Sequence, residues 1–212
     1  MLFHMIKCSF AGLMLMASCL PLSAMRMEKI HIVSEDGHRM KVLVYRPDTL
    51  AGEPSTGVLW IHGGGYITGM AAMDGMMGMG PILVRKHGYV VVSPEYRLGR
   101  EGRYPNALDD CYAALKYMAE HADELGIRKD QVFVGGESAG GGLCAALCML
   151  ARDRGEVWIA FQMPLYPMID DRDTDSSRDN HNKEPLRPDV SKTAIERFEK
   201  AFEKAQSTYY RK

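Results

Sequence analysis

Residues 131–142 read QVFVGGESAGGG, and this stretch decides how we interpret the fold. An apolar run typical of a buried strand, 131–134, breaks at two glycines, presents one serine and continues into leucines at helical spacing. The serine stands in Gly136-Glu137-Ser138-Ala139-Gly140, which fits the G-x-S-x-G pattern of a tight strand-to-helix turn that exposes a serine hydroxyl. Ser138 is therefore the candidate nucleophile. The alternative is a glycine-rich turn without chemistry, which five residues alone do not exclude.

A second glycine motif, His62-Gly63-Gly64-Gly65, lies upstream, directly after the apolar run 58–61. Acyl-transfer chemistry needs backbone N–H donors aimed at the oxyanion of a tetrahedral intermediate. The turn that carries the serine supplies one donor, the N–H of Ala139, so Gly64 and Gly65 are the candidates for the others. A flexible glycine turn is the alternative, and the presence of both motifs in the expected order weakens it.

Five blocks of sequence show a resemblance to a known family. They are His62-Gly63-Gly64-Gly65, Glu95-Tyr96-Arg97-Leu98, Tyr104-Pro105-Asn106-Ala107-Leu108-Asp109-Asp110, Gly136-Glu137-Ser138-Ala139-Gly140-Gly141 and Leu165-Tyr166-Pro167. With these blocks, about residues 29–170 resemble the α/β-hydrolase fold-3 family, the hormone-sensitive-lipase-like bacterial carboxylesterases.

The resemblance implies a serine hydrolase that cleaves short-chain acyl esters of small molecules through an acyl-enzyme, without a cofactor. It implies that Ser138 is the nucleophile and that Gly64, Gly65 and Ala139 surround the oxyanion. The remaining motif residues that we expect to support this site are His62, Gly63, Gly136, Glu137 and Gly140. The same resemblance makes Arg97, Asp109 and Asp110 structural ion-pair or capping groups.

No residue in the sequence clearly fits the role of the acid or of the histidine in a catalytic triad. A serine needs a histidine base that a carboxylate orients, and in this fold the chain order is serine, acid, histidine. His181 is the only histidine after Ser138, and it lies in the polar run 172–183, where a solvated loop histidine is the simpler interpretation. We therefore expect impaired turnover. The alternatives are a non-catalytic remnant or ligand-binding module of the same fold, and a serine peptidase, which shares the serine motif without specific support.

The resemblance fades after Pro167, which favours a hydrolase core that lacks its final strands. A premature stop or a wrong gene boundary explains this most simply, and a short natural variant is the alternative. The last part, 171–212, is a divergent tail with an amphipathic helix over Ser191–Gln206. Because cutting a sheet exposes a strand edge, we expect a tendency to form homo-oligomers unless that helix covers the edge.

Residues 1–24 have the basic start, apolar middle and small-residue end of a signal peptide, but Met25 and Met27 are alternative starts for the chain. The sequence leaves a secreted or periplasmic location and a cytoplasmic one about equally open. The hydrolase core then covers 25–170. Three cysteines beyond the leader, Cys111, Cys144 and Cys148, are an odd number on helical segments and indicate reduced core residues.

The composition is that of one globular domain. Hydrophobic residues make up 46% of the chain, charged residues 25%, and the net charge is −1, which argues against disorder and against a nucleic-acid partner. No run of eighteen apolar residues predicts a membrane span, and no Cys/His cluster has the spacing of a metal site. Five methionines follow the first glycine motif, at 70, 73, 76, 77 and 79, where packing is favoured over an acyl-pocket lining.

The periodicity of the chain predicts an α/β fold. Two alternating runs, 29–33 and 40–45, flank Asp36-Gly37 as a hairpin. Four short apolar runs, typical of buried parallel strands, lie at 58–61, 89–92, 131–134 and 160–165, with helices expected at 81–87, 106–120 and 141–152. This order predicts a three-layer α/β-hydrolase sandwich with a mostly parallel sheet, and a site at the carboxyl ends of the strands.

Overall fold

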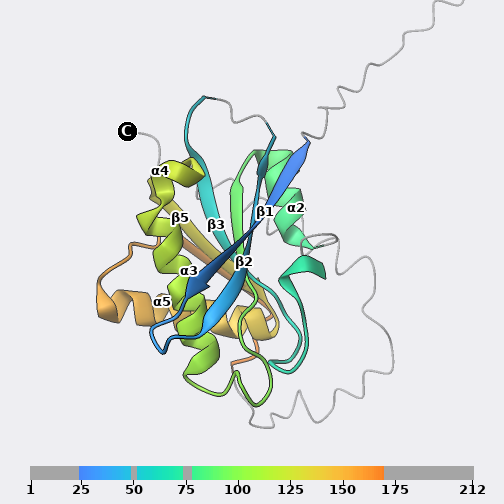
Figure 1. The fold of residues 1–212 in the computed structure, drawn as a ribbon, viewed down its shortest axis with the longest axis vertical. Helices are drawn as coiled ribbons and strands as arrows, with labels where there is room; N and C mark the ends of the chain where they lie inside the picture. Colours follow the sequence, from blue (N-terminus) through green and yellow to red (C-terminus); the bar gives the residue numbers. More distant parts are fainter. Residues whose placement is uncertain (1–23, 49–51, 74–77, 170–212) are drawn as a thin grey trace, which may run out of the picture.

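The computed structural model describes residues 24–48, 52–73 and 78–169, which form a six-stranded sheet with helices on both faces (Figure 1). The strands are β1 (Met25–Val33), β2 (Arg39–Pro47), β3 (Ser55–Ile61), β4 (Val90–Pro94), β5 (Ile127–Glu137) and β6 (Phe161–Leu165). The helices are α2 (Met79–His87), α3 (Asn106–Glu120), α4 (Ala122–Leu125) and α5 (Ala139–Arg154). Residues 1–23, His181 and the helix expected over Ser191–Gln206 lie outside the described residues.

The sheet is mostly parallel, as predicted. Its strand order is β1-β2-β4-β3-β5-β6. The β1–β2 and β2–β4 pairs are antiparallel, whereas β4, β3, β5 and β6 run parallel. Because β3, β5 and β6 are neighbours with the same direction, their carboxyl ends meet at one edge of the sheet. The glycine motif follows β3, Ser138 follows β5, and residues 166–169 follow β6.

The predicted hairpin joins β1 to β2. At its turn the Ser34 N–H donates to the His38 carbonyl at 2.9 Å, and the Gly37 N–H donates to the Ser34 carbonyl at 2.9 Å. Gly37 has a φ of 83°, a left-handed conformation that glycine adopts without steric cost. The register then pairs every residue of β1 with one of β2, from Val33 opposite Arg39 to Met25 opposite Pro47.

Two hydrophobic layers, one on each face of the sheet, explain why the strands are apolar runs. On one face, Val42, Leu59 and Val134 pack with α3 and α5. On the other face, Leu43, Trp60 and Phe133 pack with α2. Figure 1 shows α3 and α5 together on one side of the sheet and α2 on the opposite side. Strands buried on both faces need apolar residues at successive positions, so the three-layer prediction is confirmed.

The ends of most elements lie within a few residues of the expected ones. Gly88 ends α2 in a left-handed conformation with a φ of 71°, directly after the helix expected at 81–87. β5 is longer than expected and begins at Ile127, because Ile127 pairs with Ser55 at the start of β3. The short helix α4 was not predicted. It ends at Gly126, again with a positive φ.

The methionines and cysteines divide between core and surface. Met79 is buried, which confirms core packing there, whereas Met70 and Met73 are about half exposed and Met76 and Met77 lie outside the described residues. The free cysteines Cys111 and Cys144 are buried. Cys148 is half-buried. Burial raises the pKa of the Cys111 thiol well above its ordinary range, so this group stays protonated.

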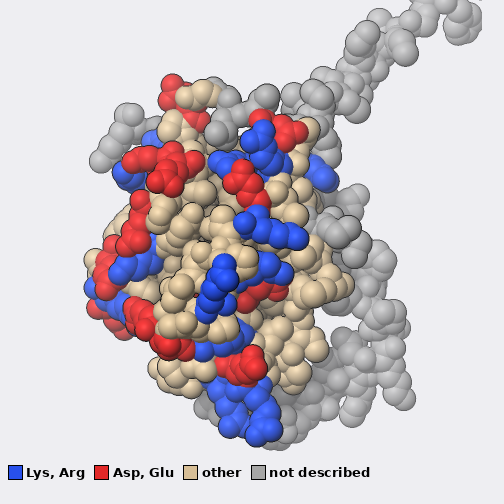
Figure 2. Space-filling model, in the orientation of Figure 1, with Lys and Arg blue, Asp and Glu red and all other residues tan. Residues whose placement is uncertain are grey.

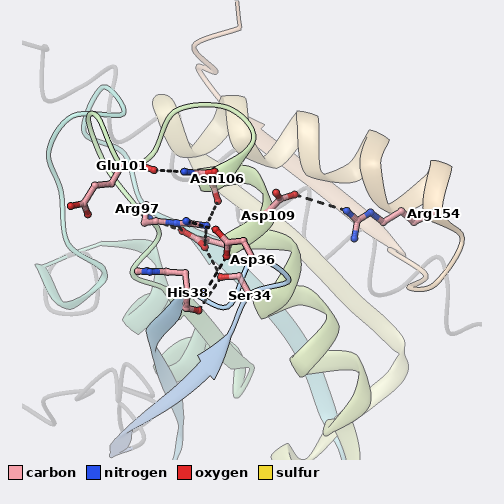
Figure 3. A network of polar contacts seen from close by, with 9 residues as sticks. Ser34, Asp36, His38, Arg97, Glu101, Asn106, Asp109 and Arg154 are labelled. Atoms are coloured by element: carbon pink, nitrogen blue, oxygen red, sulfur yellow. Dashed lines mark hydrogen bonds and ion pairs between the residues drawn. The ribbon is translucent and has the colours of Figure 1, made fainter.

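Arg97 and Asp110 form a buried ion pair that joins α3 to the hairpin and to the segment after β4 (Figure 3). The Asp110 side chain is fully buried, and it accepts from Arg97 Nε at 2.9 Å and Arg97 Nη2 at 2.8 Å. The Arg97 backbone N–H and the Ser34 hydroxyl also donate to this carboxylate. Asp109 instead faces Arg154 at 3.9 Å. The expected structural role is therefore confirmed for the Arg97–Asp110 pair.

On the face drawn in Figure 2, acidic and basic side chains are interspersed among uncharged ones. Among the described helices, none is both long and apolar enough to cross a bilayer.

Candidate active site

Ser138 lies at the junction between β5, which ends at Glu137, and α5, which begins at Ala139. Its φ of 52° and ψ of −116° place a non-glycine residue in a conformation that costs free energy and persists only when the surroundings impose it. Such strain is the signature of a G-x-S-x-G turn that lifts the serine side chain off the sheet. The structure thus gives Ser138 the backbone geometry that the sequence predicts.

The two glycines of the motif are needed because the backbone closes tightly around the serine. A Cβ on Gly136 would lie 2.6 Å from the Gly140 carbonyl carbon and 2.8 Å from the Ile61 carbonyl oxygen. A Cβ on Gly140 would lie 2.5 Å from the His62 carbonyl oxygen. Real Cβ contacts are longer, so only glycine lets the start of α5 pack against the end of β3.

The glycine loop after β3 lies directly beside the serine. A Cβ on Gly63 would lie 3.4 Å from the Ser138 Cβ and 3.2 Å from the Glu137 carbonyl oxygen. Gly64 follows with a φ of 125°, and its carbonyl accepts from the Thr68 N–H at 2.9 Å, which closes the loop on itself. Gly65 also has a positive φ, 64°. The structure therefore brings the two motifs together, while the oxyanion roles of Gly64 and Gly65 stay predictions.

Ala139 is the first residue of α5 and is fully buried. Its N–H belongs to the first turn of a sixteen-residue helix, where the backbone donors have no partner within the helix and the helix dipole favours negative charge. This position suits the donor role that the sequence assigns to Ala139.

The His62 side chain contacts the glycine loop and holds it in place. Its ring is buried and stacks on Tyr96 with centroids 4.3 Å apart, and Nδ1 lies 2.8 Å from the Gly63 carbonyl oxygen. Since a carbonyl only accepts, Nδ1 carries the proton, and Nε2 finds no partner among the described residues. Burial lowers the pKa of His62, so the ring is neutral near pH 7. The bond also fixes the peptide plane between Gly63 and Gly64, and with it the direction of the Gly64 N–H.

The segment Leu165–Met168, at the end of β6, wraps around Ser138. The Ser138 N–H donates to the Leu165 carbonyl at 3.0 Å, and the Met168 N–H donates to the Ser138 carbonyl at 2.9 Å. The Tyr166 hydroxyl donates to Glu137 Oε2 at 2.7 Å. The Leu165-Tyr166-Pro167 block is part of the family resemblance in the sequence, whereas no local pattern predicts the contact of Met168 with Ser138.

Known proteins with similar sequences and structures are consistent with a serine at a strand-to-helix turn. The family described as "alpha/beta hydrolase fold" matches residues 58–209. The chain belongs to this family. Its relatives place it in the fold-3 branch, beside bacterial carboxylesterases, as the sequence resemblance implies.

Three relatives illustrate this placement. Esterase LipI of Mycobacterium tuberculosis is 36% identical over 130 residues, which are 58% of this chain and 38% of LipI. Ethyl acetate hydrolase of Pseudomonas putida is 34% identical over 146 residues, 66% of this chain and 44% of that enzyme. The structure of a bacterial heroin esterase is similar with a TM-score of 0.70 at 38% identity, over 76% of this chain and 51% of that one. The chain thus spans less than half the length of these two curated relatives.

No described histidine hydrogen-bonds the Ser138 hydroxyl. His87 ends α2, His121 follows α3, and His62 donates its Nδ1 proton to the Gly63 carbonyl. His181 lies outside the described residues. Within the three described ranges, no cluster of His, Cys, Asp and Glu could hold a metal ion. The arrangement therefore offers a nucleophile beside a loop of backbone donors, and its proton acceptor is not among the described residues.

Proposed function

We propose that this chain is a carboxylesterase-type serine hydrolase that acts on small-molecule esters with short acyl groups. The observation that carries the proposal is the strained backbone of Ser138 at the β5–α5 junction, with Gly63 of the glycine loop packed against it. The names of the relatives, an esterase and an ethyl acetate hydrolase among them, support ester substrates.

In the proposed reaction, the Ser138 oxygen attacks the ester carbonyl carbon and loses its proton, and the carbonyl oxygen becomes an oxyanion. The N–H groups of Ala139, Gly64 and Gly65 are the proposed donors to this oxyanion. The Ser138 proton passes through water to the departing alkoxide, which leaves as an alcohol. A second water then hydrolyses the acyl-enzyme, which releases the carboxylic acid and restores the serine hydroxyl. The positive end of the α5 dipole favours the same developing negative charge.

Proton transfer limits the proposed rate. A serine without a histidine base loses most of its activation, whereas the oxyanion donors and substrate binding alone leave about 10³-fold acceleration over water. We therefore propose slow turnover, with His181 as the weak candidate for the base. The competing proposal is a non-catalytic remnant or ligand-binding module of the same fold, which would keep the glycine loop beside Ser138 and lack covalent chemistry.

Covalent labelling distinguishes these proposals. A fluorophosphonate probe should label the purified chain at Ser138, and p-nitrophenyl acetate should be hydrolysed slowly. Ser138→Ala should abolish labelling and lower hydrolysis, whereas Ser55→Ala, at the opposite end of the sheet, should change neither. His181→Ala should lower the labelling rate only if His181 is the base. A folded chain that never reacts with the probe would leave the non-catalytic proposal standing.

The location of the protein is a separate proposal. We propose that residues 1–24 act as a leader if the protein is exported, and that translation otherwise begins at Met25 or Met27. N-terminal sequencing of the protein from its own cells would read a mature terminus near residue 25 in either case, so secretion into the medium or periplasm is the deciding measurement.

A further inference from the structure

The three described non-glycine residues with positive φ all lie at the site. They are Tyr66 with a φ of 63°, Ser138 with 52° and Tyr166 with 32°. Each belongs to a different segment, and these segments follow the neighbouring strands β3, β5 and β6. Strained residues persist only where their surroundings hold them, so contacts among these three segments must fix the geometry.

Tyr66 makes those contacts. Its hydroxyl donates to the Met168 carbonyl at 2.7 Å, and its own carbonyl accepts from the Gly99 N–H at 2.7 Å. Met168 in turn donates its N–H to the Ser138 carbonyl at 2.9 Å. One tyrosine thereby joins the glycine loop, the segment after β4 and the segment after β6, and the last of these is bonded to the nucleophile.

The packing around the hydroxyl agrees with a fixed position. Gly142, in the first turn of α5, lies so close to the Tyr66 Oη and the Met168 carbonyl that a Cβ there would overlap both. Partial burial raises the pKa of Tyr66, so the hydroxyl keeps its proton and remains a donor through the neutral pH range.

We infer that Tyr66 is a positioning residue, which couples the glycine loop to the nucleophile turn through the backbone of Met168. The inference rests on the proposed function, since it describes how the oxyanion donors stay in register with Ser138. The hydroxyl touches neither Ser138 nor the proposed oxyanion donors. It acts by holding Met168, because small displacements of donor and nucleophile cost much of the rate.

The test uses Tyr66→Phe, which removes only the hydroxyl. Its matched control is Tyr112→Phe, which removes a hydroxyl bonded to Glu156 at 3.1 Å, away from the site. Hydrogen exchange at the Met168 and Ser138 amides should become about fivefold faster in Tyr66→Phe, the factor that corresponds to about 1 kcal/mol for one hydrogen bond, and should not change in the control. Fluorophosphonate labelling of Ser138 should slow by about tenfold, and the kcat for p-nitrophenyl acetate should fall with little change in KM.

Gly142→Ala provides a second route to the same bond. The new methyl group would overlap the Tyr66 hydroxyl and the Met168 backbone carbonyl, so it should separate Tyr66 from Met168. A cooperative melt identifies conditions where the variant is folded, and there it should show the same kcat loss. The double variant should lose no more than the worse single variant, because both act through one bond.

The outcomes separate the two proposals. If wild-type protein is never labelled, the proposed function fails, while unchanged amide exchange in Tyr66→Phe would overturn the coupling independently. Faster exchange with an unchanged labelling rate would also overturn the positioning role. So would an equal loss of labelling in Tyr66→Phe and Tyr112→Phe, because that would show a general effect on stability.

Discussion

Two regions of this chain are held together in different ways. One is the edge of the sheet around Ser138, here called the site, and the other is the set of polar contacts around the Arg97–Asp110 ion pair, here called the network. At the site, positive φ angles and glycines allow close backbone approach, and most bonds run between backbone groups. In the network, charged side chains on ordinary backbone make the bonds, around a fully buried carboxylate (Figure 3). A buried charge therefore need not mark a reactive site. Here the charged cluster stabilises the fold, and the edge with the strained backbone presents the nucleophile.

Removing the buried carboxylate should have the largest effect. Asp110→Ala leaves the Arg97 guanidinium, only 10% exposed, without its main partner, which should cost about 3–5 kcal/mol of unfolding free energy. The exposed pair Lys129–Asp123 provides the control, because Asp123→Asn should cost less than about 1 kcal/mol. Urea denaturation measures both. At a temperature where the variant is folded, the labelling rate of Ser138 should be near the wild-type rate, and a large loss would show that the network also serves the site.

Gly63→Ala should have the opposite effect, a slower labelling of Ser138 with little loss of stability. The added methyl would press on the Glu137 carbonyl at 3.2 Å and on the Ser138 Cβ at 3.4 Å, so the nucleophile turn must shift by a few tenths of an ångström. We expect labelling of Ser138 to slow by about tenfold, with less than about 1 kcal/mol change in unfolding free energy. Gly80→Ala in α2 is the control, since its methyl meets only Val91 at an ordinary 3.6 Å. Equal labelling in the two variants would contradict the close approach of loop and serine.

Acid should weaken the two regions in different pH ranges. Burial lowers the pKa of His62 below its ordinary 6.5, so the unfolded chain binds a proton more readily and unfolding free energy falls as pH drops below about 6.5. The Arg97 bond and the His38 N–H lower the pKa of Asp36 below 3.8, so its contribution disappears only below about pH 4. Denaturation midpoints measured from pH 8 to pH 3 should show both steps. His62→Asn should lose the upper step, and His31→Asn, an exposed histidine, should retain it.

Tyr166→Phe should have the smallest effect of the four. Its hydroxyl bonds Glu137 at 2.7 Å, but the side chain is 63% exposed, so water replaces the lost partner. We expect less than about 0.5 kcal/mol change in unfolding free energy and a labelling rate within about threefold of wild type. A loss as large as that of Tyr66→Phe would mean that the Glu137 contact, rather than the Met168 contact, holds the turn.

The sequence predicted the local parts of this fold well because the deciding forces act over a few residues. Alternation and an Asp-Gly turn predicted the hairpin, and apolar runs predicted strands whose two faces are buried. The glycines of the serine motif predicted a tight turn, and the structure shows that Gly136 and Gly140 pack against the end of β3. The helix α4 escaped prediction because four residues carry too little periodicity, and its end depends on the fit of Gly126 before β5.

The sequence by itself determined the family, the nucleophile candidate and the candidate donors, because each depends on short motifs whose backbone requirements are local. It also indicated that Arg97 and Asp110 are structural. Only the tertiary structure decided that β4 lies between β2 and β3, that Asp110 rather than Asp109 receives Arg97, and that Tyr66 reaches Met168, 102 positions along the chain. Those contacts join residues far apart in sequence and depend on how the whole sheet packs. No local sequence pattern therefore predicts them.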